Sequence, residues 1–125
     1  MSVTEAKVIA HIEHELDRAR RYFLNIHGSM FSKNGSADFM TLDSDGVLTA
    51  IEAKAPGAQP YVNQWRNAID VVKSGGRFIV AYDDFTVEDM DAHELKFFRI
   101  GSEIGLSEFE AELEDRTHSV EVILI

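Results

Sequence analysis

The sequence predicts an α/β fold in which a central mixed β-sheet is flanked by helices. Segments with the apolar spacing of an amphipathic helix alternate with short segments of β-strand character, in the order α-β-β-α-β. The chain has 125 residues, 45% of them hydrophobic, which suits one domain with a real core. No internal repeat, low-complexity segment or linker divides it, so we expect a single domain over residues 1–125.

The first expected element is an amphipathic helix over residues 3–23. Glu5 lies on its apolar stripe, where a carboxylate is costly unless it is paired, binds a metal or lies at an open end. Alternatively, Glu5 closes a capping box that starts at Ser2 and only satisfies a backbone donor. Glu13 and Glu15 fall at the edges of the stripe, where charge is ordinary. The stripe itself consists of Ile9, Ile12, Leu16, Ala19 and Phe23.

The expected sheet core follows this helix. A second helix, which starts near Pro60 and ends before Gly75, should present Tyr61, Trp65, Ala68 and Val72 as its apolar face. The other elements are a loop over 25–36, strands over 37–42 and 47–54, and a strand over 77–82.

Residues 83–125 are expected to form an acidic extension packed on a core of residues 1–82. Strands are predicted over 94–100 and 119–125, with a short helix between them. Nine acids and nine bases cancel over residues 1–78, so the entire net charge of −10 arises after residue 78. The first two thirds of the chain could therefore face a polyanion, whereas the last third would be repelled by one.

Composition excludes several kinds of site. The chain has no cysteine, which rules out disulfides, thiol catalysis and thiolate metal sites and leaves oxygen and imidazole as metal ligands. It has neither a basic start followed by an apolar segment nor an apolar run that could span a bilayer. We therefore expect a cytoplasmic protein with no membrane association.

The segment DGVLTAIEAK, residues 45–54, carries the most informative pattern. Ala50, Glu52 and Lys54 share one face of its strand, so an acid and a base point the same way. A two-residue turn before this strand would place Asp38 and Glu52 on opposite faces. A three-residue loop over 44–46, with Gly46 in the left-handed conformation, would instead make Asp38 and Glu52 cross-strand neighbours. Glycine at the last loop position favours the second geometry.

A pair of adjacent carboxylates requires a nearby cation. At a separation of about 4 Å they repel by roughly 4 kcal/mol at an effective dielectric near 20. Lys54 supplies one positive charge, and Mg²⁺, which takes one or two carboxylates and keeps its waters, would neutralise the pair more completely. The alternative is a surface hairpin with solvated acids.

These residues together resemble the PD-(D/E)XK nuclease superfamily, and within it the small VRR-NUC (virus-type replication-repair nuclease) group. The resemblance covers roughly residues 4–82 and departs from the family's Pro-Asp at Ala37. It is carried by the acid on the first helix, GSADF (35–39), IEAK (51–54), NQWRNAI (63–69) and the glycine pair 75–76.

The resemblance implies a restriction-endonuclease-like core and a function. Asp38, Glu52 and Glu5, with the Ala53 carbonyl, would bind Mg²⁺ or Mn²⁺. Lys54 would assist the attacking water, and Gln64 would support the site. The activity implied is a metal-dependent endonuclease of DNA, which we expect to prefer branched or Holliday-junction DNA and to act as a homodimer. The cations expected to contact DNA are Arg20, Lys33, Arg66 and Lys73.

Two alternatives remain open from the sequence. One is a catalytically inactive acidic binding protein, or DNA mimic, that engages a DNA-binding partner. The other is an EF-hand Ca²⁺ loop over 41–52, which Thr41 and the lack of flanking helices disfavour. His11, His14 and His27 are available as proton carriers, but nothing in the sequence assigns them a role.

Overall fold

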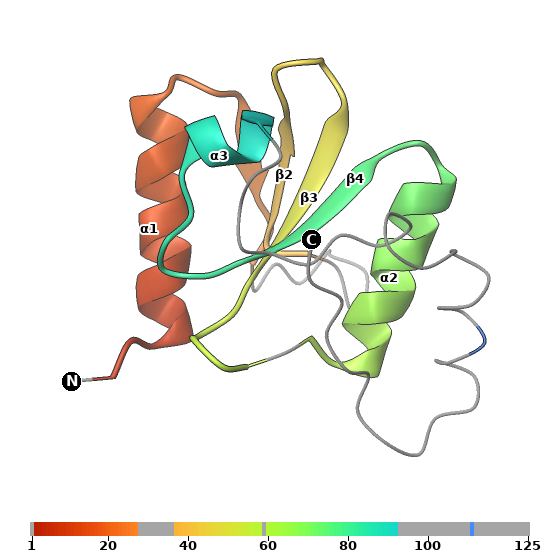
Figure 1. The fold of residues 1–125 in the computed structure, drawn as a ribbon, viewed down its shortest axis with the longest axis horizontal. Helices are drawn as coiled ribbons and strands as arrows, with labels where there is room; N and C mark the ends of the chain where they lie inside the picture. Colours follow the sequence, from red (N-terminus) through yellow and green to blue (C-terminus); the bar gives the residue numbers. More distant parts are fainter. Residues whose placement is uncertain (1, 28–36, 59, 93–110, 112–125) are drawn as a thin grey trace.

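Two helices lie on opposite faces of a four-stranded mixed β-sheet in the computed structural model (Figure 1). The structure describes residues 2–27, 37–58, 60–92 and 111. The elements are α1 (Glu5–Arg18), β1 (Phe23–Asn25), β2 (Phe39–Leu42), β3 (Leu48–Ala53), α2 (Val62–Lys73), β4 (Arg77–Ala81) and α3 (Val87–Ala92).

The described strands are arranged in the order β1-β2-β3-β4. β1 pairs antiparallel with β2, and β2 with β3, whereas β3 and β4 are parallel. A parallel pair needs a crossover between its strands, and α2 provides it. The predicted α/β class, with a mixed sheet flanked by helices, is confirmed at this level.

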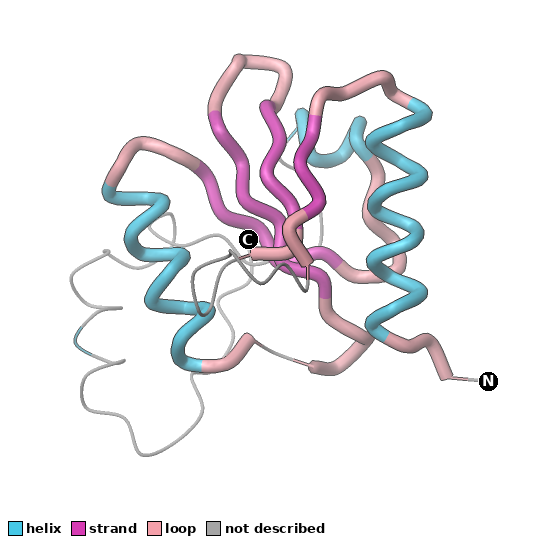
Figure 2. Tube along the Cα trace, turned by 180° about the vertical axis from the view of Figure 1, so that it is seen from behind, coloured by secondary structure: helices cyan, strands magenta, loops and turns pink. Residues whose placement is uncertain are grey.

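Each face of the sheet has its own core. On one face, Val8, Ile12 and Leu16 of α1 pack against the cluster that contains Ile51 and Ala53 of β3. The other face is covered by α2 (Figure 2). The side chains of α2 pack there against those of β3 and β4. This second cluster contains Trp65, Ala68, Ile69, Ala50, Phe78 and Val80. Because side chains alternate along a strand, Glu52 shares the α2 face with Ala50.

The hairpin has the predicted three-residue loop. The register pairs Leu42 with Leu48 and Phe39 with Ile51, and Asp43 N donates to Val47 O at 3.0 Å. Gly46 has φ 78°, the left-handed conformation that the loop requires. One further step along this register brings Asp38 opposite Glu52, as predicted.

The hairpin also excludes the EF-hand. The flanking elements are strands, not helices. The Asp43 carboxylate accepts hydrogen bonds from the backbone N–H groups of Asp45 and Val47 and pairs with Arg77. It therefore stabilises the loop and the start of β4.

The first helix is shorter than predicted. It ends at Arg18 rather than at residue 23, and Arg20 adopts a positive φ of 54° that a helix cannot continue through. Phe23 then lies in β1, where its ring packs edge-on against Phe39 at 6.0 Å. The prediction that Phe23 belongs to the helix stripe was wrong, because Phe23 pairs with β2 and is partly buried there.

Three positions differ from the predicted apolar faces. Val8 is buried, and Glu15, placed by the sequence at the edge of the stripe, is only 7% exposed. Glu15 is compensated by Arg18 at 2.6 Å and by Val87 N at 3.2 Å, which together keep its pKa below the usual range. Tyr61, expected on the apolar face of α2, is 74% exposed because it precedes the helix as its N-cap.

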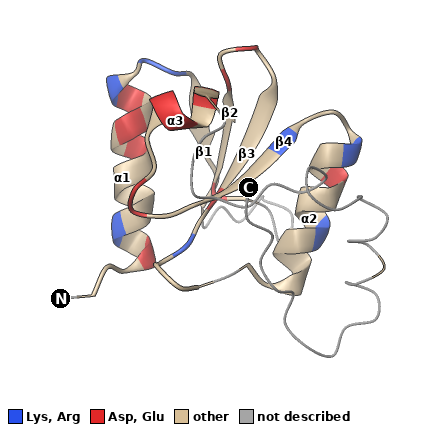
Figure 3. Ribbon diagram, viewed as in Figure 1, with Lys and Arg blue, Asp and Glu red and all other residues tan. Residues whose placement is uncertain are grey.

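The acidic stretch after β4 contains the short helix α3, which was not predicted. Its acids meet arginines at the end of α1: Arg18 pairs with Glu88 at 2.6 Å, and Arg21 with Asp91 at 2.8 Å. Figure 3 shows α3, with its acidic positions in red, beside the end of α1. Part of the negative charge after residue 78 thus fixes α3 to α1.

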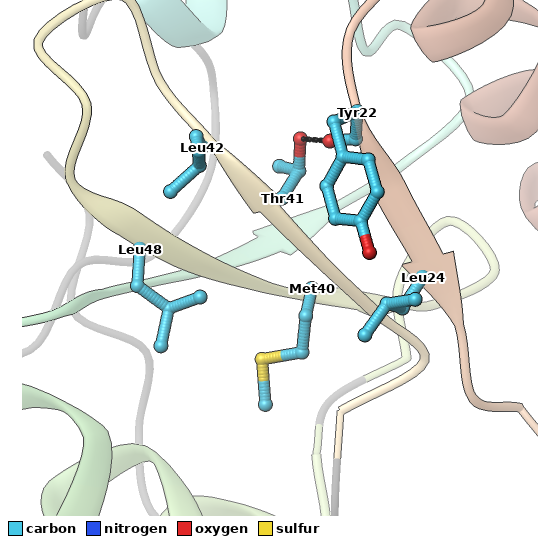
Figure 4. A pocket seen from close by; sticks show the side chains of 6 residues that line it. All are labelled: Tyr22, Leu24, Met40, Thr41, Leu42 and Leu48. Atoms are coloured by element: carbon cyan, nitrogen blue, oxygen red, sulfur yellow. Dashed lines mark hydrogen bonds between the residues drawn. The ribbon is translucent and has the colours of Figure 1, made fainter.

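One part of the sheet carries exposed apolar side chains. Tyr22, Leu24, Leu42 and Leu48 are between 41% and 67% exposed, and they surround Met40 in a shallow hollow (Figure 4). Thr41 Oγ1 donates to Tyr22 O at 2.7 Å and joins β2 to the residue before β1.

Apart from residue 111, the predicted elements over 94–125 lie outside the described residues, as does Lys33. Within the described part of the chain, none of the helices has the length and apolar character needed to cross a membrane.

Candidate active site

The predicted acids and lysine meet where β3 ends. In Figure 1 the segment that leaves β3 passes the amino end of α1 before it reaches the amino end of α2. Glu52 lies in β3 and Lys54 follows it, Glu5 begins α1, and Gln64 lies in the first turn of α2. Elements from both faces of the sheet therefore contribute to one cluster.

Glu52 is at the centre of this cluster and is 2% exposed. Its Oε2 accepts a hydrogen bond from Gln64 Nε2 at 3.1 Å and lies 3.8 Å from Lys54 Nζ. Its Oε1 is buried and meets no hydrogen-bond donor of the described residues. A buried carboxylate oxygen without a donor is costly, so Glu52 Oε1 is suited to contact a cation or a hydrogen-bond donor.

The electrostatics of Glu52 lead to the same conclusion. Burial, the negative charge of Asp38 and hydrogen bonding between the two carboxyl groups together raise its pKa to about 9, against the opposing effect of Lys54. At neutral pH the Glu52 carboxyl of the metal-free protein therefore keeps its proton, which a bound cation would displace.

Asp38 is 5% exposed and is held by two groups. Its Oδ2 accepts a hydrogen bond from Ala53 N at 2.8 Å, and its Oδ1 lies 2.5 Å from His27 Nδ1. The first contact crosses from β2 to β3 and fixes the carboxylate beside Glu52, which is the neighbourhood that the hairpin register predicted.

Lys54 is a buried ammonium with acidic neighbours. It is 4% exposed, and its Nζ lies 3.7 Å from Glu5 Oε1 and 3.8 Å from Glu52 Oε2. The ring of Tyr61 lies over it, with 4.6 Å between Nζ and the ring centroid. Burial of an ammonium is costly, and the two carboxylates and the aromatic face compensate for it.

Glu5 is less buried than the helix pattern implied, since its side chain is 42% exposed. The N-cap of α1 is Thr4, whose Oγ1 accepts from Lys7 N at 3.2 Å. The carboxylate of Glu5 lies beside Lys54 instead of forming the capping box suggested by the sequence. In this arrangement Glu5 neutralises the lysine.

Gln64 joins α2 to the site. Its Oε1 accepts a hydrogen bond from Tyr61 N at 2.8 Å, and its Nε2 donates to Glu52. One side chain therefore caps the helix and donates to the central carboxylate.

The donors present fit a hard divalent cation. Within the described ranges, no three His, Asp or Glu side chains are grouped closely enough to hold an ion. The set that fits consists of two carboxylates, Asp38 and Glu52, with the backbone carbonyl of Ala53. Mg²⁺ is commonly bound by only one or two carboxylates while it keeps waters for its substrate. The buried Glu52 Oε1 is the atom that such an ion would satisfy.

No protein-family model, curated protein or solved structure matches this chain. A functional assignment must therefore come from the chemistry of the site itself.

Of the cations predicted to contact DNA, the three that the structure describes, Arg20, Arg66 and Lys73, do not gather around this site. Arg20 follows the far end of α1, and Lys73 lies in the last turn of α2, whereas Glu5 and Gln64 lie in the first turns. Arg66 is exposed and lies two positions after Gln64, so the two side chains are about 200° apart around α2, on opposite sides of the helix. Figure 3 shows the described Lys and Arg residues dispersed over several elements.

Two residues at the site were missed. His27 contacts Asp38 because β1 pairs with β2, and the sequence pattern gave no sign of β1. Tyr61 was assigned to a buried helix face. The proline before it, typical of a helix start, was the one signal that Tyr61 could be a cap.

Proposed function

We propose that this chain is a Mg²⁺- or Mn²⁺-dependent deoxyribonuclease with a restriction-endonuclease-like core of the PD-(D/E)XK type. The observation that carries the proposal is the buried pair Asp38 and Glu52, with Lys54 beside it and the donor-free Oε1 of Glu52. The order α1-β2-β3-α2-β4, with the acids at the strand ends and Gln64 on the following helix, supports the same family.

Each residue of the site would have its own role in phosphodiester hydrolysis. Asp38, Glu52 and the Ala53 carbonyl would hold the cation, and Gln64 keeps Glu52 in place. When bound, Mg²⁺ or Mn²⁺ supplies Lewis-acid chemistry, acidifying water and polarising the scissile phosphate. Lys54 Nζ is placed to orient the attacking water or to offset charge that develops on the phosphate. Glu5 would complete the cation site or keep Lys54 in position.

A preference for branched DNA and assembly as a homodimer belong to the same proposal. A single site of this kind cuts one strand. Paired cuts across a junction require two sites related by a two-fold axis. A dimer would also double the basic surface of a chain that has few cations near its site.

The test is cleavage of linear and branched DNA in Mg²⁺, in Mn²⁺ and in a chelator. Asp38→Asn and Glu52→Gln should abolish cleavage and weaken metal binding. The matched control is Glu13→Gln, because Glu13 lies on α1, outside the proposed site, and accepts a hydrogen bond from Asn25 Nδ2 at 2.8 Å. Full activity in either site variant would remove the proposed site. No cleavage in any metal, together with binding to a basic protein, would favour the acidic binding protein instead.

A further inference from the structure

Tyr61 is a large aromatic side chain exposed beside the proposed catalytic lysine. It is 74% exposed, whereas Lys54, on which its ring lies, is 4% exposed. One face of the ring is directed at the ammonium at 4.6 Å, and the high exposure leaves much of the remaining ring open to solvent. An aromatic ring left in water at this position is available to a ligand.

The backbone that carries the ring is held in place by the site itself. Gln64 accepts a hydrogen bond from Tyr61 N through Oε1 and donates to Glu52 through Nε2. The backbone of Tyr61 is therefore fixed relative to the central carboxylate, and the ring lies over Lys54 Nζ. A ring on a fixed backbone loses less conformational entropy when a ligand binds to it.

The ligand that suits this surface is a nucleobase. Bases stack on aromatic side chains regardless of sequence, because every base has a π-face. A base stacked on the outer face of the ring at about 3.5 Å would lie within about 8 Å of Lys54 Nζ, next to a phosphate bound at the site. Stacking does not depend on positive charge, of which this chain, with a net charge of −10, has little to offer.

We infer that Tyr61 stacks on an unpaired base next to the scissile phosphate, so that the substrate is DNA with a single-stranded segment at the cut. The inference rests on the proposed nuclease function. In an intact duplex both faces of each base are already stacked, and only a flap, a frayed end, a junction or a single strand presents a free face. Tyr61 would thus determine specificity rather than catalyse the reaction.

The experiment measures binding without cleavage. A short fluorescein-labelled single strand of mixed sequence and the matching blunt duplex are titrated by fluorescence anisotropy with Ca²⁺ in place of Mg²⁺, and a gel checks that the DNA stays intact. Tyr61→Leu keeps an apolar side chain over Lys54 but removes the ring, and Tyr61→Phe keeps the ring. Tyr22→Leu is the matched control, because Tyr22 is also an exposed tyrosine, at 67%, and lies beside Leu42 and Leu48 rather than beside Lys54.

Tyr61→Leu should weaken single-strand binding by roughly 5- to 150-fold, the range of one base stack, and leave duplex binding unchanged. Tyr61→Phe and Tyr22→Leu should bind as the wild type does. Thermal melting of each variant checks folding, which the backbone-mediated cap at Gln64 should preserve.

Equal losses on both DNAs, no loss for Tyr61→Leu, or no single-strand binding by the wild type would each overturn the stacking role. The two proposals can fail separately. If the chain cuts branched DNA but Tyr61→Leu binds single strands as the wild type does, the nuclease proposal stands and the stacking contact is refuted. If the chain binds single strands through Tyr61 but cuts no DNA, the stacking contact stands and the nuclease proposal is refuted.

Discussion

Glu52 is a carboxyl group that folding makes hard to ionise. Its pKa is raised from 4.5 to about 9 by burial and by Asp38. Between these values the unfolded chain is ionised while the folded chain keeps the proton. The metal-free protein should therefore lose stability as pH rises from about 5 to about 9, by up to about 1.4 kcal/mol per pH unit. Chemical denaturation in a chelator at several pH values measures this slope.

The same experiment has a matched pair of variants. Glu52→Gln should flatten the slope in this window, because glutamine has no proton to release, whereas Glu13→Gln should leave it unchanged. A wild-type stability that does not fall with pH would contradict the buried, protonated carboxyl. Excess Mn²⁺ should stabilise the wild type more at pH 8 than at pH 6, because fewer protons then have to be displaced.

Lys54 should affect the chemical step more than the cation site. We predict that Lys54→Ala slows single-turnover cleavage by about 100-fold or more, the usual loss when one charge-stabilising group is removed. Binding of Mn²⁺, measured by calorimetry at a pH high enough to ionise Glu52, should change far less. A variant that loses metal binding and cleavage in parallel would show that Lys54 only maintains the acids in their ionised forms.

His27 should act through Asp38. Its Nδ1 lies 2.5 Å from Asp38 Oδ1, so the imidazole orients a proposed ligand. Loss of such a partner typically costs about 10- to 100-fold in metal affinity, which is the loss we predict for His27→Ala. His27→Asn, which keeps a short donor, should recover part of it. His14→Ala, an exposed change on α1, serves as the control. Unchanged affinity in His27→Ala would leave the contact without a role.

Helices and strands were predictable where their own residues determine them. The strand over 47–54, the crossover helix after Pro60 and the left-handed Gly46 follow from alternation, helix spacing and turn chemistry. The predicted cross-strand neighbours Asp38 and Glu52 followed from that single loop. These local signals were sufficient to predict that Lys54 and Gln64 lie near Glu52.

The errors arose where a distant element determines the structure. α1 ends at Arg18, where Arg18 pairs with Glu88 of α3, and Phe23 pairs with β2. The helix spacing shows neither α3 nor β2 as a partner. Glu15 is buried for the same reason, since its partner Val87 N is far along the chain. His27 reached the site only through β1. Tertiary contacts overrode local pattern in each case.

The turn between α2 and β4 gives a test of packing between elements. A Cβ at Gly76 would lie 2.9 Å from Val71 Cγ1 and 3.1 Å from Leu48 O, so alanine there forces α2 and β3 apart. We predict that Gly76→Ala lowers the free energy of unfolding by about 1–3 kcal/mol. Ser74→Ala, an exposed change at the end of α2, should cost much less. Urea denaturation compares the two, and equal stabilities would refute the tight packing at this turn.

The assembly of the domain follows from the proposed reaction. A chain that makes paired cuts should be a dimer in solution, with a mass twice the 14.0 kDa of one copy. Light scattering at micromolar concentration measures this mass with and without branched DNA. A mass of one copy under both conditions would refute the dimer, and with it the paired-cut preference, while single-strand cleavage could still proceed.

The charge distribution of the domain predicts an unusual response to salt. Arg18, Arg21 and Arg77 are paired with acids, and the remaining described cations are dispersed, so few phosphates can be neutralised at once. Each neutralised phosphate contributes about −0.7 to −0.9 to the slope of log K against log salt. We therefore predict a slope no steeper than about −2 for DNA binding in Ca²⁺, with binding lost in a chelator because the acids then repel the backbone. Anisotropy titrations across a range of KCl concentrations measure both effects. A slope several times steeper, or binding that survives the chelator, would mean that a basic surface rather than the cation and the Tyr61 ring holds the DNA.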